Sequence, residues 1–203
     1  MESQVGDRSE DEIHQIVQRV LNRYAGLSTQ AAPAAAGPAA PKTSSSADQS
    51  AVGRKVVAIG ADHGGFELKE VLKADLAKMG YEVIDVGTHS KDAVDYPDFA
   101  HDVARLVGSG KAWRGIMIDG AGIGSCIVAN KVPGVRAGMA YDYSSALNSR
   151  EHNDTNVLTL GAGLIGANLA KQIVNVWLVT EFGGGRHAGR VNKITAVEKQ
   201  YLK

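Results

Sequence analysis

The sequence has a single cysteine, no net charge and no long apolar run, and each of these features excludes a class of protein. Its single cysteine, Cys126, allows neither an internal disulfide framework nor a cysteine-rich zinc site, and favours a reducing, cytoplasmic compartment. Lys and Arg number 22, as do Asp and Glu, so the basic excess typical of nucleic-acid-binding proteins is missing. No apolar run is long enough to span a bilayer, and the acidic N-terminus is unlike a secretory signal, so we expect no membrane association.

Glycine, in contrast, is abundant. The chain has 24 glycines but only 5% aromatic residues, which suits a protein whose loops bring the backbone close to a small ligand. Hydrophobic residues make up 44% of its 203 residues, enough to build a core.

The first 53 residues differ from the rest in composition. Residues 28–53 are rich in Ala, Pro and Ser and hold almost no large apolar side chain, which predicts a flexible linker. Within residues 1–27, Ser9 and Glu12 have the spacing of a capping box at the start of an amphipathic helix. The apolar stripe of this helix consists of Ile13, Ile16, Val17, Val20, Leu21 and Tyr24. Such a stripe needs a partner, so the helix folds back on the main domain, self-associates or docks on another protein.

Residues 54–203 alternate apolar strands with helical segments. We predict strands at 56–60, 81–86, 115–118, 135–140 and 156–160. We predict helices at 66–78 and 97–107, up to 130, at 143–150 and 166–180, and from 186 to the C-terminus. This alternation indicates an α/β domain of three layers, with a five-stranded parallel sheet covered on both faces. Ligands of such sheets bind beyond the carboxyl ends of the strands.

Two of these strand ends carry polar and glycine-rich segments. The first strand is followed by Asp62 and His63, a carboxylate and an imidazole that can bind a polyol, although both are also ordinary turn residues. The third strand is followed by Asp119 and by glycines at 120, 122 and 124, whose successive N–H groups form a plausible phosphate or oxyanion cradle. Because the second strand does not end in an acidic residue, we disfavour a dinucleotide cofactor.

Two further segments have a chemical character. Residues 150–154, Arg-Glu-His-Asn-Asp, precede the fifth strand, but some of them serve equally well as helix caps and turn formers. Arg186 and Arg190 share one helix face and can clamp a phosphate, whereas a solvated basic face is the plainer explanation of such a pair.

Together these segments resemble one family. The stretch from Val57 to Lys199 is similar to the ribose-5-phosphate isomerase B family, which includes the galactose-6-phosphate isomerase subunits. The resemblance rests on five ordered blocks: GADHGGFELKE, DVGTHSKDAVDYPDFA, GAGIGSCIVANKVPGVRA, SREHNDTNVLTLGAG and TEFGGGRHAGRVNKI. It implies a Rossmann-like domain that interconverts an aldose phosphate and a ketose phosphate without a metal or cofactor. It also implies homodimers, or dimers of dimers, whose active sites use residues from two subunits.

The resemblance assigns roles to the segments described above. Asp62 and His63 contact the sugar and its phosphate, and His152 assists ring opening beside Asn153, which holds the enediolate. The arginines grip the phosphate from the other subunit, and Tyr96 lies near the sugar. The remaining residues implied by the resemblance shape the oxyanion loop: Gly120, Gly122, Gly124 and Ser125.

The chain departs from the family at the position of the base. Many members have a cysteine where this chain has Asp119, and others have a glutamate where it has Ser125. Cys126 restores neither arrangement, and we interpret it as a small buried residue. We therefore predict Asp119 as the base. Gly163 replaces a phosphate-binding arginine of many members, which leaves the length of the sugar open. The competing interpretation is a sugar-phosphate-binding or regulatory protein that has lost catalysis.

The N-terminal extension resembles the encapsulation peptides of enzymes packaged in bacterial microcompartments. This resemblance is one of pattern: a short amphipathic helix joined to an enzyme domain by an Ala/Pro/Ser linker. It implies docking on shell or cargo proteins through residues 9–25.

Overall fold

The computed structural model describes residues 55–201. The predicted N-terminal helix and linker, at 1–27 and 28–53, lie outside the described residues. The strands are β1 (Val56–Ala61), β2 (Glu82–Asp85), β3 (Arg114–Asp119), β4 (Ala137–Met139) and β5 (Val157–Gly161). The helices are α2 (Phe66–Lys78), α3 (Tyr96–Gly108), α4 (Ile123–Ala129), α5 (Tyr143–Asn153), α6 (Ala167–Val179) and α7 (Arg186–Tyr201). Every predicted strand and helix of this part of the chain is present.

The strands form one parallel sheet in the order β2-β1-β3-β5-β4. The central strands β1, β3 and β5 are almost wholly buried, as their mainly apolar sequences predict. The edge strand β4 has three residues, fewer than the predicted 135–140. The other edge strand, β2, ends at Asp85, so the expectation that the second strand lacks an acidic end was wrong; this carboxylate accepts hydrogen bonds from Lys69 Nζ. Because all strands run the same way, the sheet has one carboxyl edge and one amino edge, and these two edges carry different functional residues.

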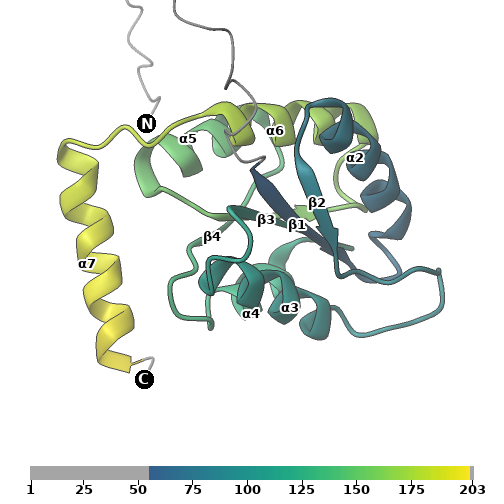
Figure 1. The fold of residues 1–203 in the computed structure, drawn as a ribbon, viewed down its shortest axis with the longest axis horizontal. Coiled ribbons are helices and arrows are strands. Elements are labelled where there is room, and N and C mark those ends of the chain that lie inside the picture. Colours follow the sequence, from purple (N-terminus) through teal and green to yellow (C-terminus); the bar gives the residue numbers. More distant parts are fainter. Residues whose placement is uncertain (1–54, 202–203) are drawn as a thin grey trace, which may run out of the picture. The chain divides into compact units, whose positions relative to one another are not determined.

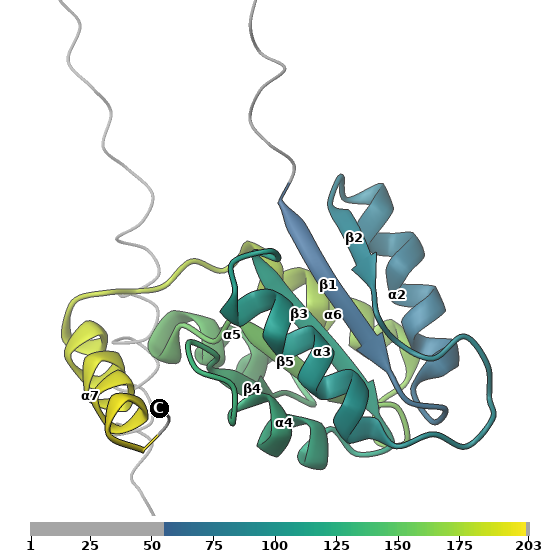
Figure 2. The same ribbon diagram turned by 60° about the horizontal axis from the view of Figure 1, so that its bottom comes forward.

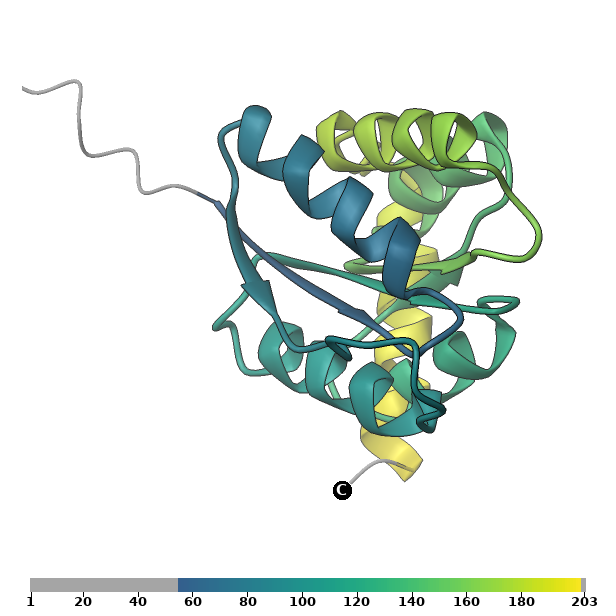
Figure 3. The ribbon, with the colours of Figure 1, turned by 90° about the vertical axis from the view of Figure 1, so that its right-hand side faces the viewer.

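Helices cover both faces of the sheet (Figure 3). The helices α2, α5 and α6 pack on one face, where Leu72, Leu158 and Trp177 belong to the larger core cluster. The helices α3 and α4 pack on the other, around Val103 and Met117. This is the predicted three-layer α/β architecture.

The last helix, α7, projects from the layered domain in two views (Figure 1 and Figure 2). It touches the domain near α5, and Glu198 accepts a hydrogen bond from the Gly134 N–H at 2.9 Å. Its side chains Ile194, Val197 and Tyr201 are 48%, 57% and 72% exposed. In residues 55–201 we find no helix with the length and hydropathy needed to cross a membrane.

One predicted boundary was wrong in a way that matters for the site. The helix predicted at 143–150 continues as α5 to Asn153, so His152 and Asn153 belong to its last turn and not to a loop. The helix ends because Asp154 adopts a left-handed backbone conformation, with φ at 48°. Arg150 fixes this turn through hydrogen bonds to Asp154 Oδ1 at 2.8 Å and to the Thr155 carbonyl.

Candidate active site

The predicted site residues separate into two clusters at opposite edges of the sheet. The carboxyl-edge cluster follows β1 and β3 and starts α3 and α4; it consists of Asp62, His63, Tyr96, Asp119, Gly120, Gly122, Gly124 and Ser125. The amino-edge cluster consists of His152, Asn153, Arg186 and Arg190, which end α5 or begin α7. The helix α5 ends just before β5 begins, which places its last turn at the amino edge.

Asp62 and His63 lie in the turn between β1 and α2. The Asp62 side chain is 7% exposed, and its Oδ1 accepts the Gly65 N–H at 3.0 Å, which closes the turn that starts α2. His63 is exposed, and its Nδ1 lies 3.1 Å from the Val94 carbonyl oxygen. This contact holds the ring against the loop between β2 and α3, and His63 Nε2 makes no hydrogen bond within residues 55–201.

Asp119 ends β3 and is 4% exposed. Its Oδ1 accepts the N–H groups of Ala121, at 2.8 Å, and of Gly122. Its Oδ2 accepts the N–H group of Ser125 at 3.2 Å and the Ser125 hydroxyl at 2.5 Å. The carboxylate therefore organises the whole loop that follows it.

The predicted N–H cradle is partly committed to this carboxylate. Gly122 and Ser125 direct their N–H groups to Asp119. Gly122 has φ at 79°, a conformation that glycine adopts without strain. Within the described part of the chain the Gly120 N–H makes no hydrogen bond, and a Cβ atom at Gly120 would meet nothing within 4 Å. Open space with a free donor thus lies over Gly120.

Tyr96 begins α3 and is 37% exposed. Its ring packs on the backbone of Gly124, the second residue of α4. The aromatic side chain therefore lies beside the Asp119 loop.

At the amino edge, His152 is paired with a residue that sequence reasoning missed. The imidazole of His187 stacks on that of His152, with ring centroids 4.0 Å apart and planes 7° from parallel. His152 Nδ1 also lies 2.7 Å from Asn148 Nδ2. The only sequence signal for His187 is its place in the segment Gly-Gly-Gly-Arg-His, directly after Arg186.

His187 is buried, whereas the arginines beside it are exposed. Burial lowers the pKa of His187 below its usual 6.5, and the positive charges of His152, Arg186 and Arg190 lower it further. Its Nδ1 is buried without a hydrogen-bond partner among residues 55–201. Neither arginine forms an ion pair within that part of the chain. Arg186 Nε donates to His187 Nε2 at 3.4 Å, and the terminal nitrogens of both guanidinium groups are available to an anion.

Two neighbouring positions bear on the predicted departures from the family. Cys126 is half-buried, and burial raises the pKa of its thiol. Less of the thiol is therefore ionised at neutral pH, so less of it can act as a base. The Gly163 N–H donates to the Gly120 carbonyl at 3.0 Å, so the loop after β5 lies directly against the Asp119 loop.

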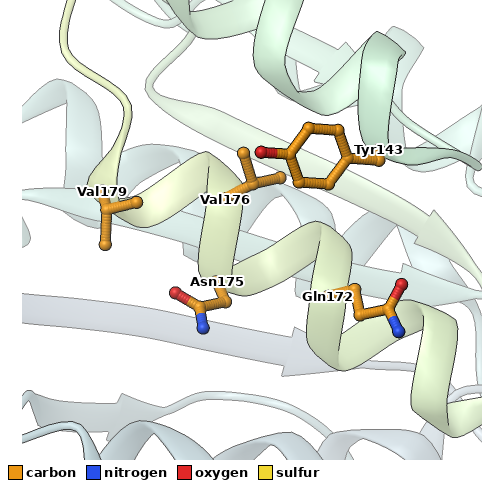
Figure 4. A pocket seen from close by; sticks show the side chains of 5 residues that line it. All are labelled: Tyr143, Gln172, Asn175, Val176 and Val179. Carbon is orange, nitrogen blue, oxygen red and sulfur yellow. The ribbon is translucent and has the colours of Figure 1, made fainter. Parts of the chain in front are cut away.

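Two cavities within residues 55–201 have linings that contain none of the predicted site residues. One of about 320 Å³ lies between α5 and α6 and is lined by Tyr143, Gln172, Asn175, Val176 and Val179 (Figure 4). Another, of about 280 Å³, adjoins the Asp62 turn at Gly64 and reaches Ala162. Within residues 55–201 no three His, Cys, Asp or Glu side chains are grouped as metal ligands.

Comparison with known proteins assigns a family to this arrangement. Residues 57–194 match the model of the ribose/galactose isomerase family. The chain belongs to this family. The matched range contains both clusters, and the chain is therefore an enzyme of the aldose–ketose isomerase type.

Named relatives agree with this assignment. Ribose-5-phosphate isomerase B of Escherichia coli is 48% identical over 146 residues, which cover 72% of the chain and 98% of that protein. D-erythrulose-4-phosphate isomerase of Pectobacterium atrosepticum is 43% identical over 148 residues, covering 71% and 95%. The solved structure of ribose-5-phosphate isomerase B from Clostridium thermocellum aligns with a TM-score of 0.71 and 53% identity, covering 72% and 99%. The predicted fold and family are thus confirmed.

Proposed function

We propose that this isomerase interconverts ribose 5-phosphate and ribulose 5-phosphate through an enediolate, without a metal ion or cofactor. The similarity to ribose-5-phosphate isomerase B supports a pentose phosphate. The similarity to an isomerase of D-erythrulose 4-phosphate keeps a four-carbon sugar among the candidates, and the glycine at position 163 keeps deoxy and six-carbon sugars among them.

We propose further that the active sites are shared between the two chains of a homodimer, or of a dimer of dimers. The observation that carries this proposal is the placement of the predicted residues at opposite edges of one sheet. A two-fold dimer that sets the carboxyl edge of one chain against the amino edge of its partner makes this contact twice, and so forms two equivalent sites. The exposed apolar side chains Ile194 and Val197 give α7 a face that a second chain can cover.

Each group in such a shared site has a chemical task. Arg186 and Arg190 hold the phosphate, which turns binding energy into orientation of the reacting carbons. His152 assists opening of the sugar ring, with Asn153 beside the nascent enediolate. At the other edge, His63 and Tyr96 contact the sugar, and the Gly120 N–H donates to the developing oxyanion. A carboxylate takes the C2 proton; the sequence predicts Asp119, and Asp62 is the other carboxylate at that edge.

The first experiment is a coupled assay of the purified full chain against tetrose, pentose, deoxypentose and hexose phosphates. Production of ketose from ribose 5-phosphate supports the proposal, and binding of all these sugars without turnover contradicts it.

The second experiment mixes two variants, Asp62→Asn and His152→Ala, that alter opposite edges. If the chains pair at random, half of the dimers are hybrids, and each hybrid has one intact site and one doubly altered site. About a quarter of the wild-type activity should therefore return. No recovery means that each site is built within one chain.

One observation favours the competing function, a sugar-phosphate-binding protein without catalysis. The carboxylate predicted as base, Asp119, already accepts hydrogen bonds on both oxygens. Calorimetric titration with ribose 5-phosphate beside the coupled assay separates the two functions, because only an enzyme converts what it binds.

We also propose that residues 1–26 direct the enzyme into a bacterial microcompartment through docking of residues 9–25 on shell or cargo proteins. The apolar stripe at helical spacing and the family match, which starts only at residue 57, support an appended targeting segment. Deletion of residues 1–26 should leave turnover intact and abolish co-localisation with shell proteins. Persistent co-localisation of the truncated chain contradicts this role.

A further inference from the structure

The two carboxylates at the carboxyl edge differ in their freedom to accept a proton. Asp119 receives four donors, two on each oxygen: three backbone N–H groups and the Ser125 hydroxyl. An ionised carboxylate offers about four lone-pair positions, so all of them are occupied. A substrate proton can reach Asp119 only if one of these hydrogen bonds breaks.

The cost of breaking one of them is high because the donors are buried. Ser125 is 0% exposed and Asp119 is 4% exposed, so water cannot replace a lost partner there. An unpaired buried donor costs about 1–3 kcal/mol. The loop of residues 120–125 would lose part of its support at the moment when it should hold the enediolate.

Asp62 lacks this constraint. Its Oδ1 accepts one N–H group, and its Oδ2 makes no hydrogen bond within residues 55–201. The buried side-chain atoms left unpaired in that range are Thr159 Oγ1 and His187 Nδ1, so Asp62 Oδ2 keeps contact with solvent. A Cβ atom at Gly64 would lie 3.4 Å from Asp62 Oδ1 and 3.6 Å from the Gly120 nitrogen. The Asp62 carboxylate and the Gly120 nitrogen are therefore neighbours of the same point beside Gly64.

We infer that Asp62 takes the C2 proton and that Asp119 is a positioning residue acting through the loop of residues 120–125. This inference rests on the proposed isomerase function and replaces Asp119 as the predicted base. The Asp62 carboxylate removes the C2 proton, the C–H electron pair forms the C1=C2 bond, and the carbonyl pair moves to O1. Asp62 then returns its proton to C1, the O2 hydroxyl proton moves to O1, and the O2 electron pair closes the ketone. No co-reactant is consumed.

The test compares Asp62→Asn with Asp119→Asn, using Asp142→Asn as the matched control. Asp142 caps α5, and asparagine caps a helix equally well, so this control should keep wild-type kinetics. General-base catalysis contributes about 10²–10⁴-fold, so Asp62→Asn should lower kcat by about that factor while calorimetry still detects binding of ribose 5-phosphate. Asp119→Asn should retain measurable turnover with the acid limb of its kcat/KM profile at the wild-type pH, because the base is unchanged.

Ser125→Ala provides a second measurement if Asp119→Asn does not fold. This variant frees a lone pair on Asp119 Oδ2. If Asp119 is the base, the acid limb of the kcat/KM profile should move; if Asp62 is the base, the acid limb should stay at the wild-type pH. A shifted acid limb in Ser125→Ala, or an active Asp62→Asn beside an inactive Asp119→Asn, overturns the inference alone. A wild-type chain that converts no sugar phosphate overturns the isomerase proposal and the inference together.

Discussion

The ring of Tyr96 lies directly against the backbone of Gly124. A Cβ atom at Gly124 would come within 2.4 Å of both Tyr96 Cζ and Tyr96 Oη. This contact joins the first turn of α3 to the first turn of α4, and so ties Tyr96 to the Asp119 loop. Any side chain at position 124 must displace the tyrosine or the loop.

The exchange Gly124→Ala should therefore impair substrate binding. We expect KM for the sugar phosphate to rise by about tenfold, equivalent to about 1.4 kcal/mol, because Tyr96 leaves its position. Steady-state kinetics measure the change. Gly189→Ala in α7 is the control, since a Cβ atom there would meet nothing within 4 Å. Equal KM values for the two variants contradict a role for this contact.

The lowered pKa of His187 makes stability depend on pH. Below the unfolded value of about 6.5, the unfolded chain takes up a proton that the folded chain refuses, so stability falls as the pH drops from there toward the folded pKa. His187→Phe keeps an aromatic ring against His152 but does not titrate. We expect a smaller loss of Tm between pH 8 and pH 5.5 in this variant than in the wild type. His101→Phe, at an exposed histidine of α3, is the control, and an unchanged pH dependence in His187→Phe counts against the assignment.

Lys69 is a fully buried ammonium group that supports the strand and helix leading to the site. Its Nζ donates to both oxygens of Asp85, at 2.9 and 2.8 Å, and thereby joins α2 to β2. Lys69→Met should lower the free energy of unfolding by about 3 kcal/mol, because Asp85 loses its buried partner. Lys73 also pairs with Asp85 but is 29% exposed, and Lys73→Met should cost less than about 1 kcal/mol. Urea titrations that give equal losses for the two variants refute this ranking.

The sequence predicts the elements of the fold well because their signals are local. Apolar runs such as Val56–Gly60 and the proline at the start of α3 mark their strand and helix within a few residues. The order of the strands was not predicted, since pairing joins segments far apart in the chain. The edge strand β4 and the end of α5 were misjudged because packing and a left-handed Asp154 decide them.

The arrangement of the candidate residues was predicted only in part. A residue between a helix and the following strand of a parallel sheet lies at the amino edge, so the sequence already held the signal that separates His152 from Asp62. The stacking of His187 and the four donors around Asp119 depend on side-chain geometry. No pattern of residue types discloses them.

The proposed sharing of each active site between two chains would make an isolated chain chemically incomplete. Specific activity should accordingly decline when the enzyme is diluted below the dissociation constant of the dimer, and it should return when the enzyme is concentrated again. Confinement at high local density inside a protein shell would then do more than gather the enzyme with its neighbours. By mass action, it would keep the two halves of every catalytic centre together.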